Sequence, residues 1–193
     1  MVRAKDKLVA LEEVAGLVPN GATVAIGGLS LNCAPMAFCR ELVRSGARDL
    51  ELVAVVSGMA VDWLLVGGCI RKLVMGLVSF EGFGLAPSFR RAAEQGTVEI
   101  EEWSEHTLIC ALQAATAGVP FMPTRAGLGT DMPATHPDRT WEMVDERSGR
   151  RFLACAALQP DIAVVHVHEA DRLGNARVNP KLVWFDNELV KEA

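Results

Sequence analysis

The sequence predicts an α/β fold with an open, mainly parallel sheet flanked by helices. Four short, mainly apolar runs typical of strands, at 22–29, 50–57, 72–80 and 161–170, and a segment at 97–103 that alternates Val98 and Ile100 with weaker positions, are separated by helical stretches. Repeated strand and helix units of this length are typical of parallel sheets covered by helices. The chain has 193 residues, of which 50% are apolar and 22% charged, and this suits one well-cored domain.

The expected helices follow from apolar spacing and from residues that begin or end helices. Asp6 is the predicted N-cap of the first helix, and Pro35 fits the first turn of the second. Ser104 is the predicted N-cap of a long apolar helix, and Gly96 is a helix stop. The helices are expected at 8–18, 35–43, 61–66, 87–95, 105–117 and from Asp186 onward.

One segment, 119–151, lacks periodicity and is rich in Pro, Gly, Thr and charged residues. We expect an irregular loop there, and loops of this length inside a compact domain are more often functional than idle. The strand expected at 161–170 is followed by a turn at 171–175, which contains Gly174-Asn175.

Composition excludes several classes of protein. The formal net charge is −5 and the 19 Lys and Arg residues are dispersed, which argues against a nucleic-acid partner. The start MVRAKDKLVALEE lacks the apolar stretch of a signal peptide, and no segment of 18 residues is free of polar or turn-forming residues, so a cytoplasmic location is expected. Five widely spaced cysteines without a CxxC pair predict reduced thiols rather than disulfides or structural zinc.

Two features lie where predicted strands end. Gly27-Gly28 lies near the end of the run at 22–29, directly after its buried strand residues. The pair allows backbone N–H groups to approach a ligand, or alternatively allows close strand and helix packing. Glu81 follows the strand at 72–80, at the sheet edge where open α/β sheets bind ligands, or alternatively accepts hydrogen bonds from its own loop. The glycine spacing is not GxGxxG, and the strand at 50–57 lacks a terminal acidic residue, which excludes a dinucleotide site.

An acidic cluster surrounds Trp103, at the junction of the expected strand and helix. It contains Glu99, Glu101, Glu102 and Glu105. Carboxylates are favoured near a helix N-terminus by the helix dipole, which is one explanation. The functional explanation is that a carboxylate against the indole is partly desolvated and its pKa raised, which suits a general acid or base. Glu102 or Glu105 is the candidate.

Three other residues have both a possible functional role and a simpler structural one. His166 and His168 project from one face of the expected strand, a spacing that suits a metal, but no third imidazole or cysteine is adjacent. We interpret them as partly buried histidines near an interface or pocket mouth. Cys33 has no histidine near it in sequence, so a packing role is favoured over a nucleophilic one.

Four segments together resemble the A subunit of family I coenzyme A transferases, most of all the glutaconate CoA-transferase type. They are IGGLSLNCAPMAFCRELVRSG at 26–46, LVSFEGFGLAPSFRRAAEQG at 77–96, AGVPFMPTRAGLGTDM at 117–132 and ALQPDIAVVHVHEADRLGNA at 157–176. The similarity covers almost the whole chain in the right order.

The resemblance implies a CoA-transferase fold paired with a homologous B subunit, often as an A2B2 heterotetramer with the active site at the A–B junction. The glutamate that attacks the acyl-CoA thioester belongs to the B-type half, and no Glu-Asn-Gly type motif is found here, so the isolated chain should be inactive. Coenzyme A thioester is then a substrate, and no tightly bound cofactor or metal is expected. Members of the family continue past the end of this chain, so residues 1–193 are expected to be a single A-subunit domain lacking its C-terminal portion.

The resemblance also implies a substrate pocket. The glycine turn from Gly27-Gly28 to Asn32 would shape it, and the Gly127–Asp131 loop would close it. With the two residues of the SFEGFG segment, the expected substrate-binding residues are Gly27, Gly28, Asn32, Glu81, Gly82, Gly129, Thr130 and Asp131.

Three functions are compatible with these residues. The first is a transferase A subunit, which exchanges CoA between an acyl-CoA and a carboxylic acid through a glutamate of the partner. The second is the A subunit of a hydrolase of the steroid ring degradation type, which opens a cyclic diketone carried on CoA and would use Glu102, or else Glu105, in its carboxylate chemistry. The third is a non-catalytic protein that binds CoA esters or sugar phosphates.

Overall fold

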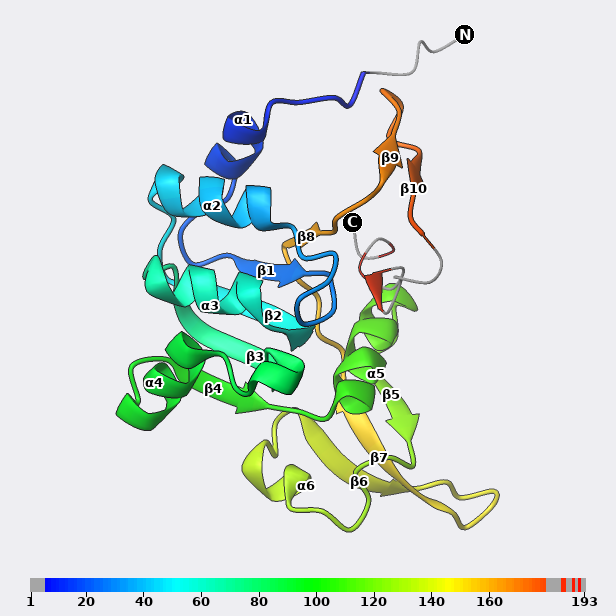
Figure 1. Ribbon diagram of the computed structural model, residues 1–193. Helices are drawn as coiled ribbons and strands as arrows, with labels where there is room; N and C mark the ends of the chain where they lie inside the picture. The colour runs from blue at the N-terminus through cyan, green and yellow to red at the C-terminus, as the bar shows by residue number, and fades with distance from the viewer. Residues whose placement is uncertain (1–5, 180–184, 187–188, 190, 192–193) are drawn as a thin grey trace, which may run out of the picture.

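A computed structural model describes residues 6–179, 185–186, 189 and 191. Its centre is a five-stranded parallel sheet with the strand order β4-β3-β2-β1-β8 (Figure 1). The strands are β1 (Thr23–Ile26), β2 (Leu50–Ser57), β3 (Ile70–Val78), β4 (Glu99–Glu102) and β8 (Ile162–Val164). The predicted mainly parallel sheet is confirmed, although β1, β4 and β8 are shorter than the segments predicted for them.

Successive side chains of the central strands point alternately into two separate hydrophobic cores. Leu52 and Ala54 of β2 face one core, and Val53 and Val55 face the other, as expected for successive side chains of a strand buried on both faces. The helices divide accordingly: α2 and α3 contribute to the first core and α5 to the second. The helices are α1 (Leu11–Gly16), α2 (Met36–Ser45), α3 (Met59–Val66), α4 (Pro87–Gln95) and α5 (Glu105–Thr116), with a 3-10 turn, η1, at Glu81–Phe83.

Most helix boundaries follow the sequence signals. Gly46 and Gly96 adopt left-handed conformations after α2 and α4, as expected for glycine helix stops. Asp6 is wrong as an N-cap, because α1 begins five residues later, after Ala10, which provides no side-chain cap. The Asp6 carboxylate instead accepts a hydrogen bond from the Leu8 N–H and pairs with Arg172.

The N-terminus of α5 is fixed by a capping box. The Ser104 hydroxyl accepts a hydrogen bond from the Thr107 N–H at 3.2 Å, and the Thr107 hydroxyl accepts one from the Ser104 N–H at 3.1 Å. Ser104→Ala should therefore lower the free energy of unfolding by about 1 kcal/mol, measured by denaturant titration. Ser88→Ala, in the first turn of α4 but not at its N-cap, is the control, and an equal loss in both variants would contradict the capping role.

The segment expected as an irregular loop at 119–151 instead contributes to a second sheet, and that prediction was wrong. Three antiparallel strands pair in the order β5-β7-β6, with a short helix, α6 (Met132–Thr135), between β5 and β6. The strands are β5 (Phe121–Thr124), β6 (Thr140–Val144) and β7 (Arg151–Ala156). Their pattern is weak because Pro123 interrupts β5 and β6 is only five residues long and contains the charged Glu142, so the pairing with β7 decides their structure.

The C-terminal part of the chain also differs from the prediction. The strand expected over 161–170 ends after three residues as β8, and a small antiparallel hairpin follows, made of β9 (Glu169–Ala170) and β10 (Ala176–Arg177). The predicted turn at Gly174-Asn175 connects these two strands. The helix expected from Asp186 onward lies largely outside the described residues. No helix in the described part of the chain is long and apolar enough to span a bilayer.

Candidate active site

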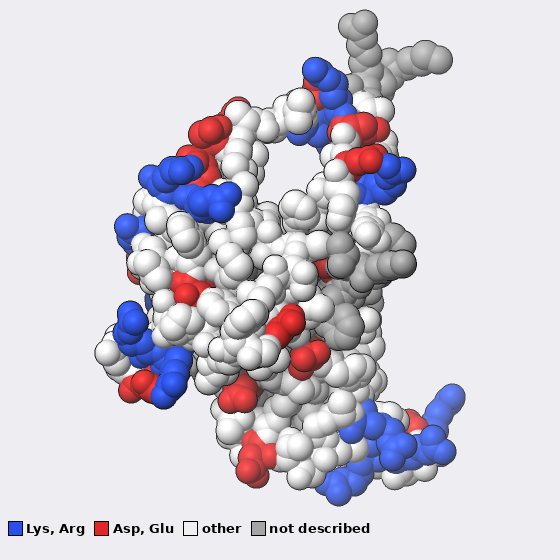
Figure 2. All heavy atoms as spheres, in the orientation of Figure 1, with Lys and Arg blue, Asp and Glu red and all other residues white. Residues whose placement is uncertain are grey.

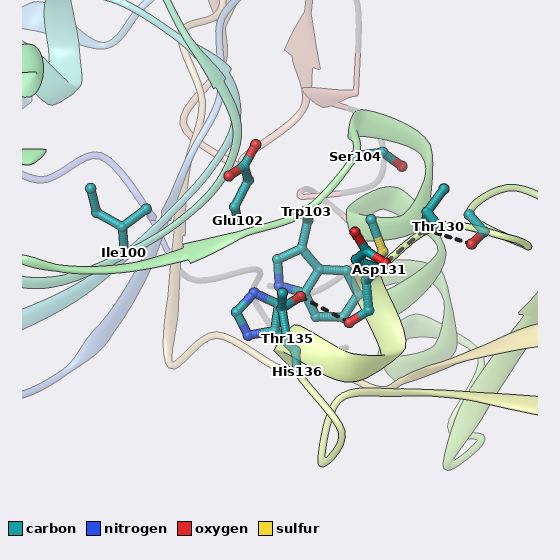
Figure 3. A pocket seen from close by; sticks show the side chains of 10 residues that line it. Ile100, Glu102, Trp103, Ser104, Thr130, Asp131, Thr135 and His136 are labelled. Carbon is teal, nitrogen blue, oxygen red and sulfur yellow. Dashed lines mark hydrogen bonds between the residues drawn. The ribbon is translucent and has the colours of Figure 1, made fainter.

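A cleft of about 770 Å³ opens where β4 ends and α5 begins. This is the carboxyl edge of the parallel sheet, the place where open α/β sheets bind ligands. One side comes from β4 and the turn that follows it, and the other from the segment that leads into and through α6 (Figure 3). The lining residues are Ile100, Glu102, Trp103, Ser104, Gly127, Thr130, Asp131, Met132, Thr135 and His136.

The two candidate carboxylates occupy different places. Glu102 is the last residue of β4, has an exposed side chain and lines the cleft (Figure 3). Glu105 begins α5, is half-buried and does not belong to the lining. The structure therefore separates Glu102 from Glu105 and brings Glu102 together with the predicted residues Thr130 and Asp131.

The carboxylate that contacts the indole is neither of the two candidates. The Trp103 Nε1–H donates a hydrogen bond to Glu101 at 2.8 Å, and Glu101 is 6% exposed. Burial by itself would raise the pKa of Glu101, but hydrogen bonds from Lys72 and Trp103 and the charges of Lys72 and Arg139 outweigh it and lower that pKa below its ordinary value. The expected desolvated acid or base beside Trp103 is thus wrong. Residues two apart in a strand share a face, which places Glu101 and not Glu102 with the indole.

The predicted glycine turn lies at the end of β1 and outside the lining of the cleft. The Gly28 N–H donates a buried hydrogen bond of 2.9 Å to the carboxylate of Asp186. A Cβ atom on Gly27 would collide with the same carboxylate. Asn32 is exposed and exchanges backbone hydrogen bonds with Leu29 across a tight turn. A carboxylate of this chain therefore already uses the N–H group that a ligand would need.

The remaining predicted substrate-binding residues also lie outside the lining. Glu81 and Gly82 are exposed in the turn η1 after β3, and Glu81 has a left-handed φ of 54°. Gly129 is adjacent to Thr130 but does not line the cleft. Substrate binding by these residues stays a prediction, because only Thr130 and Asp131 of the expected substrate-binding residues line the cleft.

Sequence reasoning did not select His136 or Thr135, which lie on the α6 side of the cleft (Figure 3). The only available signal was that both belong to the long aperiodic segment, whose length indicated a functional role. None of the described residues that line the cleft is a Lys or Arg, whereas Glu102 and Asp131 are carboxylates. In Figure 2, basic side chains gather instead over α2, over α4 and at the end of the β6–β7 hairpin. The cleft itself thus disfavours an anionic group.

The histidines and cysteines are placed as follows. His166 and His168 are exposed in this chain, with ring centroids 5.8 Å apart, because β8 ends before them. The chain alone therefore does not bury them, and their expected place near an interface stays a prediction. Among the described residues, no group of three or more His, Cys, Asp or Glu side chains could hold a metal. Burial raises the pKa of the Cys39 and Cys155 thiols to about 12, which keeps both protonated. Cys33 is half-buried.

Comparison with known proteins identifies the family of this chain. The family described as Coenzyme A transferase matches residues 9–193. This chain belongs to the coenzyme A transferase family. The resemblance stated from the sequence is therefore confirmed.

Two curated relatives show the range of activities among similar A subunits. The cholesterol ring-cleaving hydrolase IpdA subunit of Rhodococcus jostii is 33% identical over 97% of this chain and 65% of its own length. The A subunit of the 3-oxoadipate CoA-transferase of Pseudomonas knackmussii is 33% identical over 94% of this chain and 63% of its own length. This member of the coenzyme A transferase family therefore spans less than two thirds of either relative.

Solved structures agree on the fold. The decarboxylase AibA/AibB matches with a TM-score of 0.79 and 34% identity, over 87% of this chain and 64% of that one. The glutaconate coenzyme A-transferase of Acidaminococcus fermentans matches with a TM-score of 0.87 and 22% identity, over 97% of this chain and 64% of that one. At 22% identity the second match shows the CoA-transferase fold alone.

Proposed function

We propose that this chain is the A subunit of a heteromeric CoA transferase, which moves CoA between an acyl-CoA and a carboxylic acid. The observation that carries the proposal is the cleft at the end of β4, which lies at the ligand-binding edge of a CoA-transferase fold. Similar chains are named as the A or alpha subunits of such enzymes, which supports a partner B subunit. We propose that this partner is homologous to the present chain and that the two form an A2B2 assembly.

In this reaction the nucleophile is a glutamate of the partner subunit. Its carboxylate attacks the thioester carbonyl, which forms an acyl-glutamyl anhydride and releases CoA as the thiolate. The thiolate then attacks the glutamyl carbonyl, so that the anhydride breaks into a glutamyl-CoA thioester and a free carboxylate. A second carboxylic acid takes the CoA by the reverse steps. Coenzyme A thioester is thus a substrate, and no tightly bound cofactor is required.

This chain would supply one wall of the acyl pocket. Ile100, Trp103 and Met132 offer apolar surface for the acyl group, and the Thr130 hydroxyl adds a polar group. Glu102 and Asp131 would repel the CoA phosphates, so the partner subunit would hold most of the phosphate charge. The substrate portion that suits this cleft is therefore the acyl part.

A hydrolase that opens a ring carried on CoA is the second candidate. It is favoured by one specific observation, the exposed Glu102 carboxylate at the mouth of the cleft, and by the similarity to IpdA. In that reaction Glu102 would take a proton from water while the water oxygen attacks a ring carbonyl carbon of the substrate. The tetrahedral adduct would then collapse to a carboxylic acid as the adjacent ring C–C bond breaks. The carbon released as an enolate would take up the proton held by Glu102.

The test uses the chain co-expressed and purified with its partner subunit. For this complex, an acyl-CoA is added, borohydride or hydroxylamine traps intermediates, thiol release is followed, and mass spectrometry locates adducts. A glutamyl thioester on the partner supports the transferase. Hydrolysis without an adduct contradicts it and favours the hydrolase, and binding without turnover or adduct indicates a non-catalytic protein.

Glu102→Gln separates the two enzymatic candidates further. For the transferase we expect kcat to fall by less than about tenfold, with the partner adduct intact, because general acid–base catalysis by this residue is not required. A fall of about 100-fold or more would instead match loss of a general base. Glu105→Gln, which changes a carboxylate outside the cleft lining, is the matched control and should leave kcat unchanged.

A further inference from the structure

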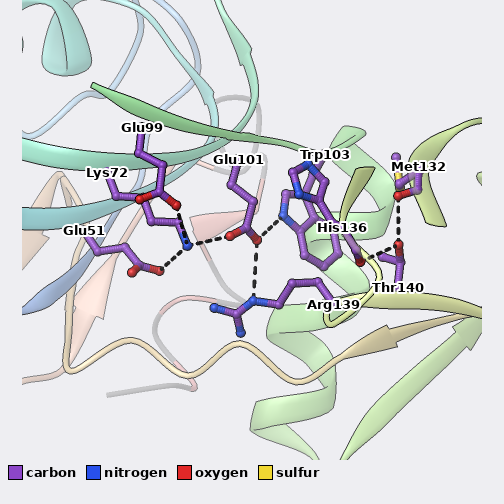
Figure 4. Close-up of polar contacts among 9 residues, drawn as sticks. All are labelled: Glu51, Lys72, Glu99, Glu101, Trp103, Met132, His136, Arg139 and Thr140. Atoms are coloured by element: carbon purple, nitrogen blue, oxygen red, sulfur yellow. Dashed lines mark hydrogen bonds and ion pairs between the residues drawn. The ribbon is translucent and has the colours of Figure 1, made fainter. Parts of the chain in front are cut away.

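The buried carboxylate next to the candidate active-site glutamate has its own set of partners. Glu101 lies 2.6 Å from Lys72 Nζ, 2.8 Å from Trp103 Nε1 and 3.6 Å from Arg139 Nε. A carboxylate this deeply buried is stable only when paired and hydrogen-bonded, and all of these contacts converge on its two oxygens (Figure 4).

The pleat of β4 sends neighbouring carboxylates to opposite faces. Glu101 joins Lys72 of the adjacent strand β3 (Figure 4), whereas the Glu102 side chain points to the opposite face of β4 and lines the cleft from there (Figure 3). The Lys72 ammonium is shared with Glu51 and Glu99 at 3.9 and 3.7 Å. The Glu101 carboxylate is therefore fixed in position by the neighbouring strand, and it can in turn fix the side chains of Trp103 and Arg139.

The other two partners of Glu101, Trp103 and Arg139, connect it to the walls of the cleft. Trp103 lines the cleft directly, and its only ring N–H group is used by Glu101. Arg139 follows the α6 segment, three residues after His136, which also lines the cleft. Among the ion pairs that join two described residues, the Arg139 to Glu101 pair is the one that connects the parallel sheet to the segment of α6 and the antiparallel sheet.

The segment that carries Arg139 is itself tied together. The carbonyl of His136 accepts hydrogen bonds from the N–H groups of Arg139 and Thr140, both at 2.9 Å. The Thr140 hydroxyl donates to the Met132 carbonyl at 3.3 Å (Figure 4). A displacement of Arg139 would therefore be passed to Met132 and His136, two lining residues on the α6 side.

We propose that Glu101 is a positioning residue, which holds the indole of Trp103 directly and the α6 wall through Arg139 and so sets the shape of the acyl cleft. The proposal rests on the proposed function in one respect, namely that the cleft binds the acyl part of a CoA thioester. The geometric part of the proposal, that Glu101 fixes the α6 wall, does not depend on the proposed function.

The test removes the link to the wall and leaves Glu101 paired with Lys72 and Trp103. In the complex with the partner subunit, Arg139→Gln should raise the KM for the acyl-CoA about fivefold, the size expected for a partly exposed ion pair, with kcat within twofold of wild type. Arg139→Lys restores the charge and should recover most of the loss. A merely structural role would lower the amount of active complex and kcat, without this change in KM.

Arg151→Gln is the matched control, because it breaks the exposed Arg151 to Glu142 pair on the same antiparallel sheet, outside the cleft lining. It should leave KM unchanged. An unchanged KM in Arg139→Gln, or an equal rise in both variants, would overturn the proposal.

A second measurement does not depend on the substrate. Arg139→Gln should accelerate amide hydrogen exchange in residues 130–140 relative to wild type, and Arg151→Gln should not. If exchange accelerates but the wild-type complex neither binds nor turns over CoA thioesters, the proposed function fails while the fixing of the wall by Glu101 stands. If exchange in 130–140 is unchanged, the positioning proposal fails whatever the enzyme does.

Discussion

Glu101→Ala should lower the free energy of unfolding by about 3 kcal/mol. The substitution leaves the Lys72 ammonium, 12% exposed, with only its two longer contacts to carboxylates, and removes the hydrogen-bond acceptor of the Trp103 indole. A buried charge that loses its nearest partner is costly because its hydration is not restored. Denaturant titration followed by circular dichroism measures the change.

Glu99→Ala is the matched control for this substitution. Glu99 pairs with the same Lys72 from an exposed position, so its removal should cost about 0.5 kcal/mol or less. Equal losses in the two variants would show that burial of the Glu101 pair has no special weight.

The effect of Glu101→Ala should also depend on pH. Because the pKa of Glu101 is held below its ordinary value in the folded state, its ionisation stabilises the fold fully above the unfolded pKa of about 4.3. This contribution is lost as pH falls through the lower, folded pKa. The difference in stability between wild type and Glu101→Ala should therefore be constant from about pH 6 to 8 and shrink below about pH 4. A difference that grows toward acid pH would contradict the lowered pKa.

Gly28→Ala should destabilise the fold by about 3 kcal/mol. Gly28 has a φ of 95°, and a Cβ atom there would lie 2.7 Å from backbone atoms of Ala34 and 2.9 Å from the Asn32 carbonyl oxygen. Backbone atoms on both sides leave no flexible side chain to move aside. Relief of the clash would shift the turn and weaken the buried hydrogen bond from Gly28 to Asp186. Thermal and denaturant unfolding measure the loss.

Gly82→Ala provides the comparison for Gly28→Ala. A Cβ atom on Gly82 would meet nothing within 4 Å, and its φ lies outside the left-handed region. This substitution should change stability by no more than about 0.5 kcal/mol in either direction. A mild effect of Gly28→Ala, equal to that of Gly82→Ala, would mean that the turn after β1 adjusts easily.

The order of the βα units was readable from the sequence because its signals are local. Apolar runs of the right length marked β2 and β3, Ser104 and Gly96 marked helix ends, and four ordered segments marked the family. Local propensity and backbone geometry act within a few residues, so such features require no knowledge of distant partners.

The antiparallel sheet and the α6 wall of the cleft could be recognised only from the tertiary structure. Strands β5 and β6 are short, and β5 contains a proline and β6 a glutamate. Their structure therefore depends on pairing with β7, which lies up to 35 residues along the chain, as in the pair of Phe121 with Ala156. The same is true of His136, whose place in the cleft depends on how the α6 segment folds against β4.

The roles of Glu101 and Glu102 depend partly on the sequence alone and partly on the tertiary structure. Side chains alternate along a strand, so the sequence by itself contained the information that Glu101 shares a face with Trp103 and that Glu102 does not, although Glu102 and Glu105 were the predicted candidates beside the indole. Only the tertiary structure decided which face is buried. The parallel register of β3 and β4 places Lys72 opposite Glu99, from where its ammonium reaches the diagonal neighbour Glu101, and the fold of the α6 segment brings Arg139. Burial and charge pairing depend on residues distant in sequence, and those contacts assign structural pairing to Glu101 and a place at the cleft to Glu102.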